Sequence, residues 1–218
     1  MGEILACLEF ARGLRAEFPH SRLFVSTSTL AGHATAEQKL NGTADGVFFA
    51  PVDYVFAVRR VLRALKPSLL VVAETEMWPN LFREARRTGA GLAMVNGRMS
   101  DRALPRYLRL GRVFPLLRTA LAAVDTLLAQ TEEMRQRFQA LGAERVAVGG
   151  NLKYDFTARV ADAGSPVAQL IERARPAKVW IAASTMADER VDEDDAVIAA
   201  WRQMRSVFLM LEIGRAHV

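Results

Sequence analysis

The sequence has few of the residues that form disulfides and protein-held metal sites. Its single cysteine, Cys7, excludes an intrachain disulfide and fits a reducing compartment. Cys7 lies in an apolar helical pattern, which favours a small core residue. The three histidines, His20, His33 and His217, have no ligand-like spacing, so the sequence argues against a zinc site built by the protein.

Long hydrophobic runs and a dinucleotide-binding fingerprint are also absent from the sequence. No apolar stretch reaches the roughly 20 residues of a membrane-spanning helix, and no signal peptide is visible. No G-x-G-x-x-G motif follows any expected strand. These absences argue against a membrane span within this sequence and against a nicotinamide or flavin dinucleotide site of the usual type.

Positive charge exceeds negative charge, with 29 Lys and Arg against 24 Asp and Glu, a net charge of +5. This excess suits an anionic partner, either a phosphorylated ligand, a membrane surface or a nucleic acid, and many ordinary domains are equally basic. No basic patch interleaved with aromatic residues points to nucleic acid. Hydrophobic residues make up 51% of the chain, which is enough to bury a core in a globular protein.

Apolar strand-like runs alternate with helical patterns along the chain, which predicts an α/β fold with a parallel sheet covered by helices on both faces. The first expected helix runs from Ile4 to Phe18, where apolar residues recur at spacings of three and four. The expected strands are Leu23–Thr29, Gly46–Ala50, the run from Leu69, Leu92–Val95, Thr126–Ala129, Val146–Val148, Lys178–Ala182 and Ser206–Leu211.

Composition divides the chain into parts. Residues 1–157 form the expected N-terminal domain, 158–176 an Ala-, Asp-, Gly-, Ser- and Pro-rich linker, and 177–211 the start of a second domain. The chain enters its first helix without a preceding strand, so we expect truncation at the N-terminus. The last seven residues, 212–218, read EIGRAHV, the in-frame translation of a widely used sequencing adapter, and are excluded from the expected fold.

The stretch Leu69–Asn80 combines an apolar strand with two carboxylates and a helix start. In an extended chain Glu74 and Glu76 would point the same way, because side chains alternate. Trp78 precedes a proline and is pushed out of the helical region, while Pro79 suits the first position of a helix. Two acids are therefore expected at the carboxyl end of a strand, where open α/β sheets bind ligands.

Other polar residues follow the expected strands in the same way, and Glu3 occupies the matching place before the first helix. Each one alone has an ordinary structural explanation, such as a turn or a helix-terminal acid. In a parallel sheet, however, these ends share one edge, so together they predict a cleft. The candidate cleft residues are Ser28, Thr29, Glu74, Glu76, Asn96, Arg98, Gln130, Asn151 and Lys153.

These segments resemble the 3-deoxy-D-manno-octulosonic acid (Kdo) transferases of lipopolysaccharide synthesis. The Glu-Thr-Glu-x-Trp-Pro-Asn segment is specific, whereas the Ser-Thr segments alone are weak. The resemblance covers nearly all of the chain from Gly2 to about Leu211. It is carried by Gly2-Glu3, Ser26–Thr29 with Gly32, Pro51–Asp53, Glu74–Asn80, Asn96–Ser100, Gly150–Asp155 and Ala182–Thr185.

The resemblance implies a glycosyltransferase of the GT-B type, with two Rossmann-like domains. The N-terminal domain would bind the lipid A precursor, and the second would bind the donor, CMP-Kdo. The family inverts the anomeric carbon, uses no metal at the reaction centre and needs no cofactor beyond the donor. It works at the cytoplasmic face of the bacterial inner membrane, an anionic surface. By resemblance, Glu3 is the catalytic base.

Physical reasoning suggests roles for the other residues. Glu74 and Glu76 could hold acceptor hydroxyls or orient Arg98 and Lys153, and these cations could meet the donor carboxylate or acceptor phosphates. For the leaving phosphate we expect a helix N-terminus with two hydroxyls, those of Ser184 and Thr185.

The chain departs from the family pattern in three places. The usual N-terminal anchor, the nucleotide-gripping segment and the His-Pro loop after Ser206–Leu211 are missing, so we expect this 218-residue chain to be inactive.

Two other classes of protein remain open. A UDP-sugar transferase or epimerase of the same architecture would use similar phosphate chemistry but would not explain the Glu74–Asn80 segment. A non-catalytic basic module is the second alternative. For such a module the basic stretches Arg59–Arg63 and Arg102–Arg118 could face anionic lipid, although solvated helix faces are the ordinary interpretation.

Overall fold

The structure is a computed structural model that describes residues 2–113, 115–155, 164–183, 185–186, 192–203 and 208–213. Within 110–117 and 208–213 the backbone alone is described. The chain divides into two compact units, Met1–Thr157 and Ala158–Val218. Each unit is treated by itself below.

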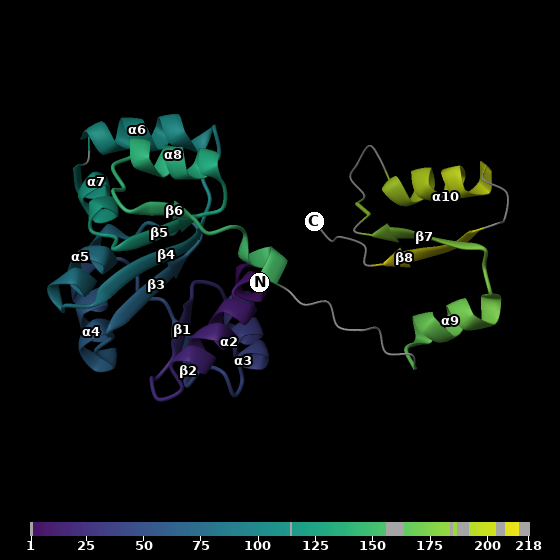
Figure 1. Ribbon diagram of the computed structural model, residues 1–218, viewed down its shortest axis with the longest axis horizontal. Helices are drawn as coiled ribbons and strands as arrows, with labels where there is room; N and C mark the ends of the chain where they lie inside the picture. Colours follow the sequence, from purple (N-terminus) through teal and green to yellow (C-terminus); the bar gives the residue numbers. More distant parts are fainter. Residues whose placement is uncertain are drawn as a thin grey trace. The chain divides into compact units, whose positions relative to one another are not determined.

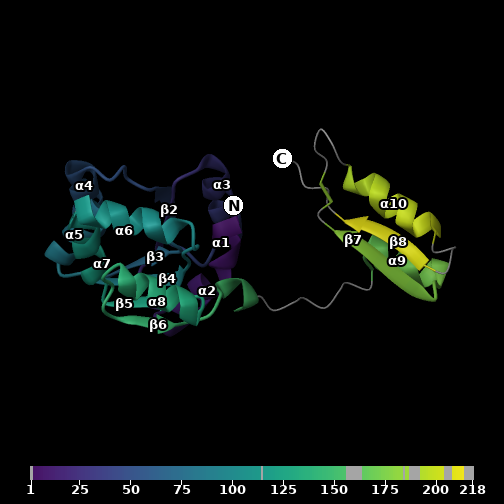
Figure 2. The ribbon, with the colours of Figure 1, turned by 90° about the horizontal axis from the view of Figure 1, so that it is seen from above.

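The strands of the N-terminal unit are all parallel, which confirms the α/β class. They form a two-stranded sheet, β1–β2, and a four-stranded sheet in the order β3-β4-β5-β6, with β3 and β6 at its edges (Figures 1 and 2). The expectation of one continuous sheet is therefore wrong in this unit, because no hydrogen-bonded pairing between described strands joins β1 to β3. The bounds are β1 Phe24–Thr27, β2 Gly46–Phe49, β3 Leu69–Ala73, β4 Gly91–Gly97, β5 Thr126–Ala129 and β6 Val146–Val148.

Helices follow the strands as the sequence predicts, with one difference at the start. The expected helix from Ile4 to Phe18 is two helices that meet at Cys7, whose N–H donates to the carbonyls of Glu3 and Ile4. The helices of this unit are α1 Gly2–Ala6, α2 Leu8–Glu17, α3 Leu30–Lys39, α4 Val55–Leu65, α5 Pro79–Arg87, α6 Ala103–Val113, α7 Pro115–Ala122, α8 Glu132–Ala140 and the 3₁₀-helix η1 Leu152–Asp155.

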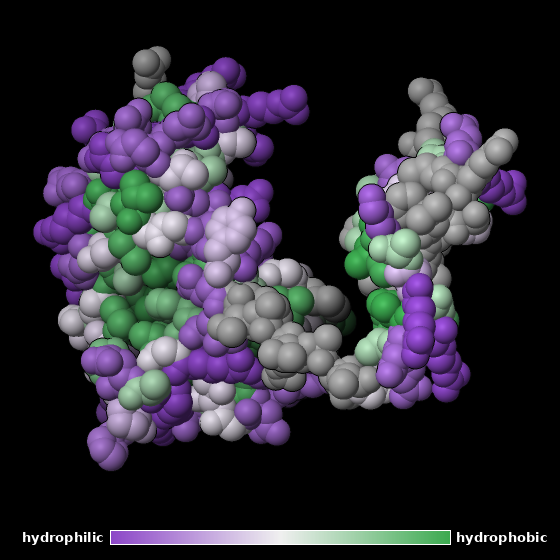
Figure 3. All heavy atoms as spheres, turned by 45° about the vertical axis from the view of Figure 1, so that its right-hand side comes forward, coloured by the Kyte–Doolittle hydropathy of each residue, from purple (hydrophilic) through white to green (hydrophobic). Residues whose placement is uncertain are grey.

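The main core lies between the four-stranded sheet and three of these helices. Phe82 of α5, Leu121 of α7 and Phe138 of α8 are fully buried against strand residues such as Met94 and Leu127. A second cluster joins α4 to α5, and a third packs α2 and α3 on β1 and β2. In the view of Figure 3 a hollowed hydrophobic area of the N-terminal unit is bordered by hydrophilic residues.

Most local helix signals are confirmed. Trp78 has a non-helical backbone, and Pro79 is the first residue of α5. The Thr131 hydroxyl caps α8 by accepting from the N–H of Met134 at 3.3 Å. Gly142 follows α8 with a φ of +100°, a backbone conformation that glycine adopts without strain. Pro105 lies inside α6, in its first turn, where no intrahelical N–H is needed.

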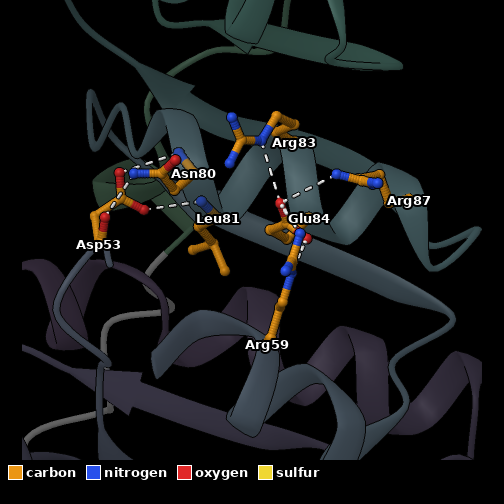
Figure 4. Close-up of polar contacts among 7 residues, drawn as sticks. All are labelled: Asp53, Arg59, Asn80, Leu81, Arg83, Glu84 and Arg87. Carbon is orange, nitrogen blue, oxygen red and sulfur yellow. Dashed lines mark hydrogen bonds and ion pairs between the residues drawn. The ribbon is translucent and has the colours of Figure 1, made fainter. Parts of the chain in front are cut away.

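Asp53 has a different role from the one its position suggests. Its place just before α4 predicts a cap for that helix, but the residue at the N-cap is Tyr54, which makes no side-chain cap. The Asp53 carboxylate instead accepts from the N–H groups of Asn80 and Leu81 at 3.0 and 2.8 Å, as Figure 4 shows. Asp53 thus caps α5, which begins 26 residues later at Pro79, and fixes the segment before α4 to the start of α5.

The C-terminal unit begins a second α/β series. Helix α9 (Pro166–Ala174), within the expected linker, is capped by the Ser165 hydroxyl. Strand β7 (Lys178–Ala183) pairs in parallel with β8 (Phe208–Ile213), and α10 spans Glu193–Gln203. Strand β8 continues to Ile213, two residues into the tail that was excluded from the expected fold.

Candidate active site

The candidate residues that follow β3, β4, β5 and β6 meet at the carboxyl edge of the four-stranded sheet. Parallel pairing of these strands places their carboxyl ends side by side. The contacts among these residues are not symmetric, however. One residue, Asn96, connects three of the four strand ends.

Asn96 lies in β4 where its pairing with β5 becomes irregular, and its φ is +56°. Such irregularities re-aim side chains next to functional sites. The Asn96 side chain is buried, with 2% exposure, and its Oδ1 accepts from Nε2 of Gln130 at 2.9 Å and from the N–H of Leu152 at 3.2 Å. Asn96 therefore ties the end of β5 and the start of η1 to β4. Its Nδ2 has no hydrogen-bond partner among the described residues.

Glu74 begins the turn after β3. The expectation of an extended chain from Glu74 to Glu76 is therefore wrong. Strand β3 ends at Ala73, and Glu74 has a φ of +59°, so the chain is not extended there. The Glu74 carboxylate is 14% exposed and lies 3.9 Å from Nη1 of Arg98, while Glu76 is exposed and has no ion pair within the described parts of the chain. Glu74 is thus the carboxylate that faces Arg98.

Thr75, which the sequence analysis did not single out, supports this arrangement. Its hydroxyl donates to the backbone carbonyl of Arg98, which connects the turn after β3 to the end of β4. The Glu74 N–H donates to the carbonyl of Val95 at 2.9 Å. The only sequence signal for Thr75 is its position between the two acids.

The segment after β6 brings Asn151 and Lys153 to the same edge. Oδ1 of Asn151 accepts from the N–H of Lys153 at 3.0 Å, a local turn that begins η1. The Lys153 side chain is exposed. Both α1 and α2 contact η1, which lies beside the N-terminus in Figure 1. The helix that carries Glu3 therefore lies against the segment that Asn96 holds.

Glu3 is exposed in the first turn of α1, the helix that ends just before Cys7. The pKa of the Cys7 thiol is raised to about 11, chiefly by burial and further by the negative charges of Glu74 and then Glu3. Glu3 and Glu74, 71 positions apart in the sequence, thus act on one thiol. The structure brings together the predicted base and the acid that faces Arg98.

Replacing Glu74 by glutamine is expected to lower the pKa of Cys7 and so to raise its alkylation rate below that pKa by roughly threefold. The reason is that the thiolate no longer faces that negative charge, whereas burial is unchanged. The rate constant of reaction with iodoacetamide, followed from about pH 8 to about pH 10.5, measures this. Glu76→Gln is the matched control. An equal rise in the control would contradict the proximity of Glu74 to Cys7.

Ser28 and Thr29 lie apart from this cluster, after β1 of the other sheet. Thr29 is the N-cap of α3, and its hydroxyl accepts from the N–H of Gly32 at 3.1 Å. Ser28 is exposed. No hydrogen bond or ion pair within the described residues joins either residue to the edge of the four-stranded sheet. The contacts therefore do not include Ser28 or Thr29 in the sheet-edge cluster.

The two donor candidates belong to the C-terminal unit. Ser184 lies outside the described residues, and Thr185 is buried with 5% exposure. The first described helix after Thr185 is α10, which begins at Glu193, and residues 187–191 lie outside the described part of the chain. The Glu193 carboxylate accepts from the N–H of Met186 at 2.8 Å. This N–H group already donates to an acidic side chain and is not free to bind a phosphate.

In the part of the chain that the structure describes, no group of three or more histidine, cysteine, aspartate or glutamate residues is arranged to hold a metal ion. No helix in that part is both long and apolar enough to cross a bilayer.

A model of one protein family, described as 3-deoxy-D-manno-octulosonic-acid transferase (kdotransferase), matches residues 1–156, the whole region that carries the sheet-edge cluster. The chain belongs to this Kdo transferase family. The resemblance inferred from the motifs is thereby confirmed. The matched region includes Glu3, Glu74, Arg98, Asn96 and the η1 segment.

Several curated relatives carry the same family name. The chain is 29% identical over 214 residues to a 3-deoxy-D-manno-octulosonic acid transferase of Haemophilus influenzae, a match that covers 94% of the chain and 46% of the relative. It is 33% identical over 155 residues to that of Chlamydophila psittaci, covering 70% and 35%. A bifunctional glycosyltransferase/methyltransferase of Fusobacterium nucleatum is 30% identical over 193 residues, covering 87% and 29%. The chain thus spans less than half the length of these relatives.

Solved structures of low sequence identity share the fold. A protein described as a UDP-N-acetylglucosamine 2-epimerase from Listeria monocytogenes aligns with a TM-score of 0.58 at 13% identity, covering 99% of this chain and 60% of that one. The S. aureus MnaA–UDP complex aligns with a TM-score of 0.55 at 12% identity, covering 98% and 60%. This likeness confirms the GT-B-type fold, and at such identity it says nothing about the reaction.

Proposed function

We propose that the complete protein transfers Kdo from CMP-Kdo to a lipid A precursor in lipopolysaccharide synthesis. The observation that carries the proposal is the cluster of Glu74, Arg98 and η1 at one sheet edge, with the helix of Glu3 in contact with η1, inside the region that matches the Kdo transferase family. The N-terminal unit would hold the acceptor, at the cytoplasmic face of the inner membrane.

Transfer would proceed by a single displacement with inversion. Glu3 takes the proton of the acceptor hydroxyl while the hydroxyl oxygen forms its bond to the anomeric carbon, and the bond to the phosphate oxygen of CMP breaks with its electron pair. A carboxylate suits this role, because a free sugar hydroxyl is a weak nucleophile. No metal or further cofactor takes part in this scheme.

The two cations at the edge would bind anionic groups. Glu74, 3.9 Å from Arg98, orients that guanidinium toward the donor carboxylate or an acceptor phosphate. Lys153, exposed on η1, serves a similar group as a point charge. Ser184 and Thr185 stay our candidates for binding the leaving phosphate.

A transfer assay on the complete enzyme tests the proposal. CMP-Kdo with lipid A precursor should yield free CMP and an acceptor heavier by one or more Kdo units, at a rate that EDTA leaves unchanged. The 218-residue chain alone should give no transfer, since its match covers only 46% of the Haemophilus influenzae relative. Consumption of a UDP-sugar instead of CMP-Kdo would favour the epimerase or UDP-sugar transferase alternative.

A further inference from the structure

The start of α5 lacks the capping side chain that helices usually supply for themselves. Its N-cap residue, Trp78, makes no side-chain cap, and Pro79 has no N–H group to donate. The first N–H groups of the helix that need an acceptor are therefore those of Asn80 and Leu81. A Ser, Thr, Asp or Asn at the N-cap position normally meets this need. Here the acceptor has to come from elsewhere in the chain.

Asp53 supplies that acceptor with both of its carboxylate oxygens. Oδ2 accepts from the N–H of Asn80 at 3.0 Å, and Oδ1 accepts from the N–H of Leu81 at 2.8 Å. In return, Nδ2 of Asn80 donates to the backbone carbonyl of Asp53 at 2.7 Å (Figure 4). We call these three hydrogen bonds the Asp53–Asn80 clamp. The carboxylate also places a negative charge at the positive end of the helix, which is favourable.

The clamp connects segments that no strand pairing connects. Asp53 follows β2 of the two-stranded sheet, whereas α5 follows β3 of the four-stranded sheet. No hydrogen-bonded pairing between described strands joins these two sheets. The bodies of α4 and α5 pack through the buried residues Val58, Leu62 and Ala85. The clamp adds directional hydrogen bonds where both helices begin, on the side where the strands have their carboxyl ends.

The turn between β3 and α5 is held at both ends by residues distant in the sequence. At its start the N–H of Glu74 donates to the carbonyl of Val95 at 2.9 Å, and the Thr75 hydroxyl donates to the carbonyl of Arg98. At its end the clamp fixes Asn80. Glu74 has a φ of +59°, and a residue other than glycine keeps such a conformation only where its surroundings hold it. The position of the Glu74 carboxylate therefore depends on the anchors at both ends.

We propose that Asp53 is a positioning residue for sugar transfer: through the clamp it fixes the turn between β3 and α5, and so keeps the Glu74 carboxylate beside Arg98. Asp53 touches no substrate in this role. The link to transfer rests on the proposed function, whereas the effect on the turn does not. An ordinary helix cap would have a narrower effect, limited to α5 itself.

Two segments that carry the family resemblance meet in this clamp. Pro51–Asp53 supplies the carboxylate, and Asn80, the last residue of the Glu-Thr-Glu-x-Trp-Pro-Asn segment, supplies the amide. Neither residue has a role in the proposed reaction. Trp78 packs against the main core from the N-cap position, while the cap itself comes from Asp53. The clamp thus allows an aromatic core residue and a fixed helix start at the same place.

Hydrogen exchange in the 218-residue chain separates positioning from capping. In Asp53→Ala the amides of Asn80 and Leu81 lose their acceptor and should exchange at least about fivefold faster, the usual effect of a lost cap. The Glu74 amide keeps its acceptor, the carbonyl of Val95, so a cap that acts on α5 alone would leave its exchange unchanged. If Asp53 fixes the turn, the Glu74 amide should also exchange faster, by roughly threefold or more. Asp53→Asn, which keeps one accepting oxygen, should lie between the wild type and Asp53→Ala.

Thr131→Ala is the matched control, because it removes the cap of α8, a helix of nine residues like α5 in the same unit. This variant should speed the exchange of the Met134 amide and leave the Glu74 amide unchanged. Thermal unfolding checks that all variants are folded. An unchanged Glu74 amide in Asp53→Ala, or an equal acceleration of that amide in Thr131→Ala, would overturn the proposal.

The complete enzyme tests the link to transfer. Asp53→Ala should lower kcat by roughly tenfold or more, because small displacements of positioned groups are costly, whereas Thr131→Ala should stay within about twofold of the wild type. Adding Glu74→Gln to Asp53→Ala should cost little more, since both changes remove the same positioned carboxylate. Undiminished kcat in Asp53→Ala, or losses that multiply in the double variant, would contradict the positioning role. A wild-type enzyme that transfers no Kdo would refute the proposed function but leave the exchange result intact.

Discussion

Replacing Glu3 by glutamine in the complete enzyme is expected to lower kcat by roughly 10²- to 10⁴-fold, the usual contribution of a positioned general base. Glutamine keeps the size and polarity of the side chain but cannot take a proton. Glu3 is exposed at the start of α1, so the substitution should not disturb packing. KM for the acceptor should change little, because the base acts in the transition state. Initial rates of CMP release measure both constants.

Glu17→Gln supplies the control for this prediction. Glu17 is also exposed, at the end of α2, and loses the same charge, so its rate should match that of the wild type. A Glu3→Gln enzyme with undiminished kcat would show that another group takes the proton, and Glu74 would then be the next candidate. A non-catalytic basic module predicts no effect from either substitution.

Replacing Asn96 by alanine is expected to lower the free energy of unfolding by about 2–4 kcal/mol. Two costs add. Alanine at a φ of +56° is strained, and the N–H of Leu152 and Nε2 of Gln130 both lose a partly buried acceptor. Urea unfolding of the 218-residue chain, analysed for the N-terminal unit, measures the loss.

Two other variants at this position separate the strain from the hydrogen bonds. Asn96→Gly removes the strain but not the loss of the acceptor, so it should be intermediate in stability. Asn96→Asp keeps the accepting Oδ1, and Nδ2 has no partner to lose among the described residues, so the hydrogen exchange of the Leu152 amide should stay slow. In Asn96→Gly that amide should exchange faster. Equal exchange in all three variants would contradict the role of Asn96 in holding η1.

Local residue chemistry made much of the fold predictable. The strands at 126–129 and 146–148 have the predicted bounds, because short apolar runs between turn signals have few alternatives. The starts of α5 at Pro79 and of α8 after Thr131 were also predictable. A proline at the first helical position and a capping hydroxyl act within three residues of themselves.

The errors share a different cause. Asp53 caps α5 rather than the helix beside it, and Glu74 lies in a turn instead of continuing the extended strand toward Glu76. In each case a partner distant in sequence, or the geometry of a turn, outweighs the local preference. A sequence pattern records which conformations are allowed at a residue but not which distant donor is within reach.

The sequence by itself determined the α/β class, the segments that end at the sheet edge and, through the Glu74–Asn80 motif, the family. These depend on periodicity, turn residues and residue identity, which are all local. Only the tertiary structure decided that Glu74 rather than Glu76 faces Arg98, that Glu3 and Glu74 lie near one thiol, and that Asn96 joins three strand ends. Those are contacts between segments about 20 to 70 residues apart, and they exist only after the strands have paired and the helices have packed on them.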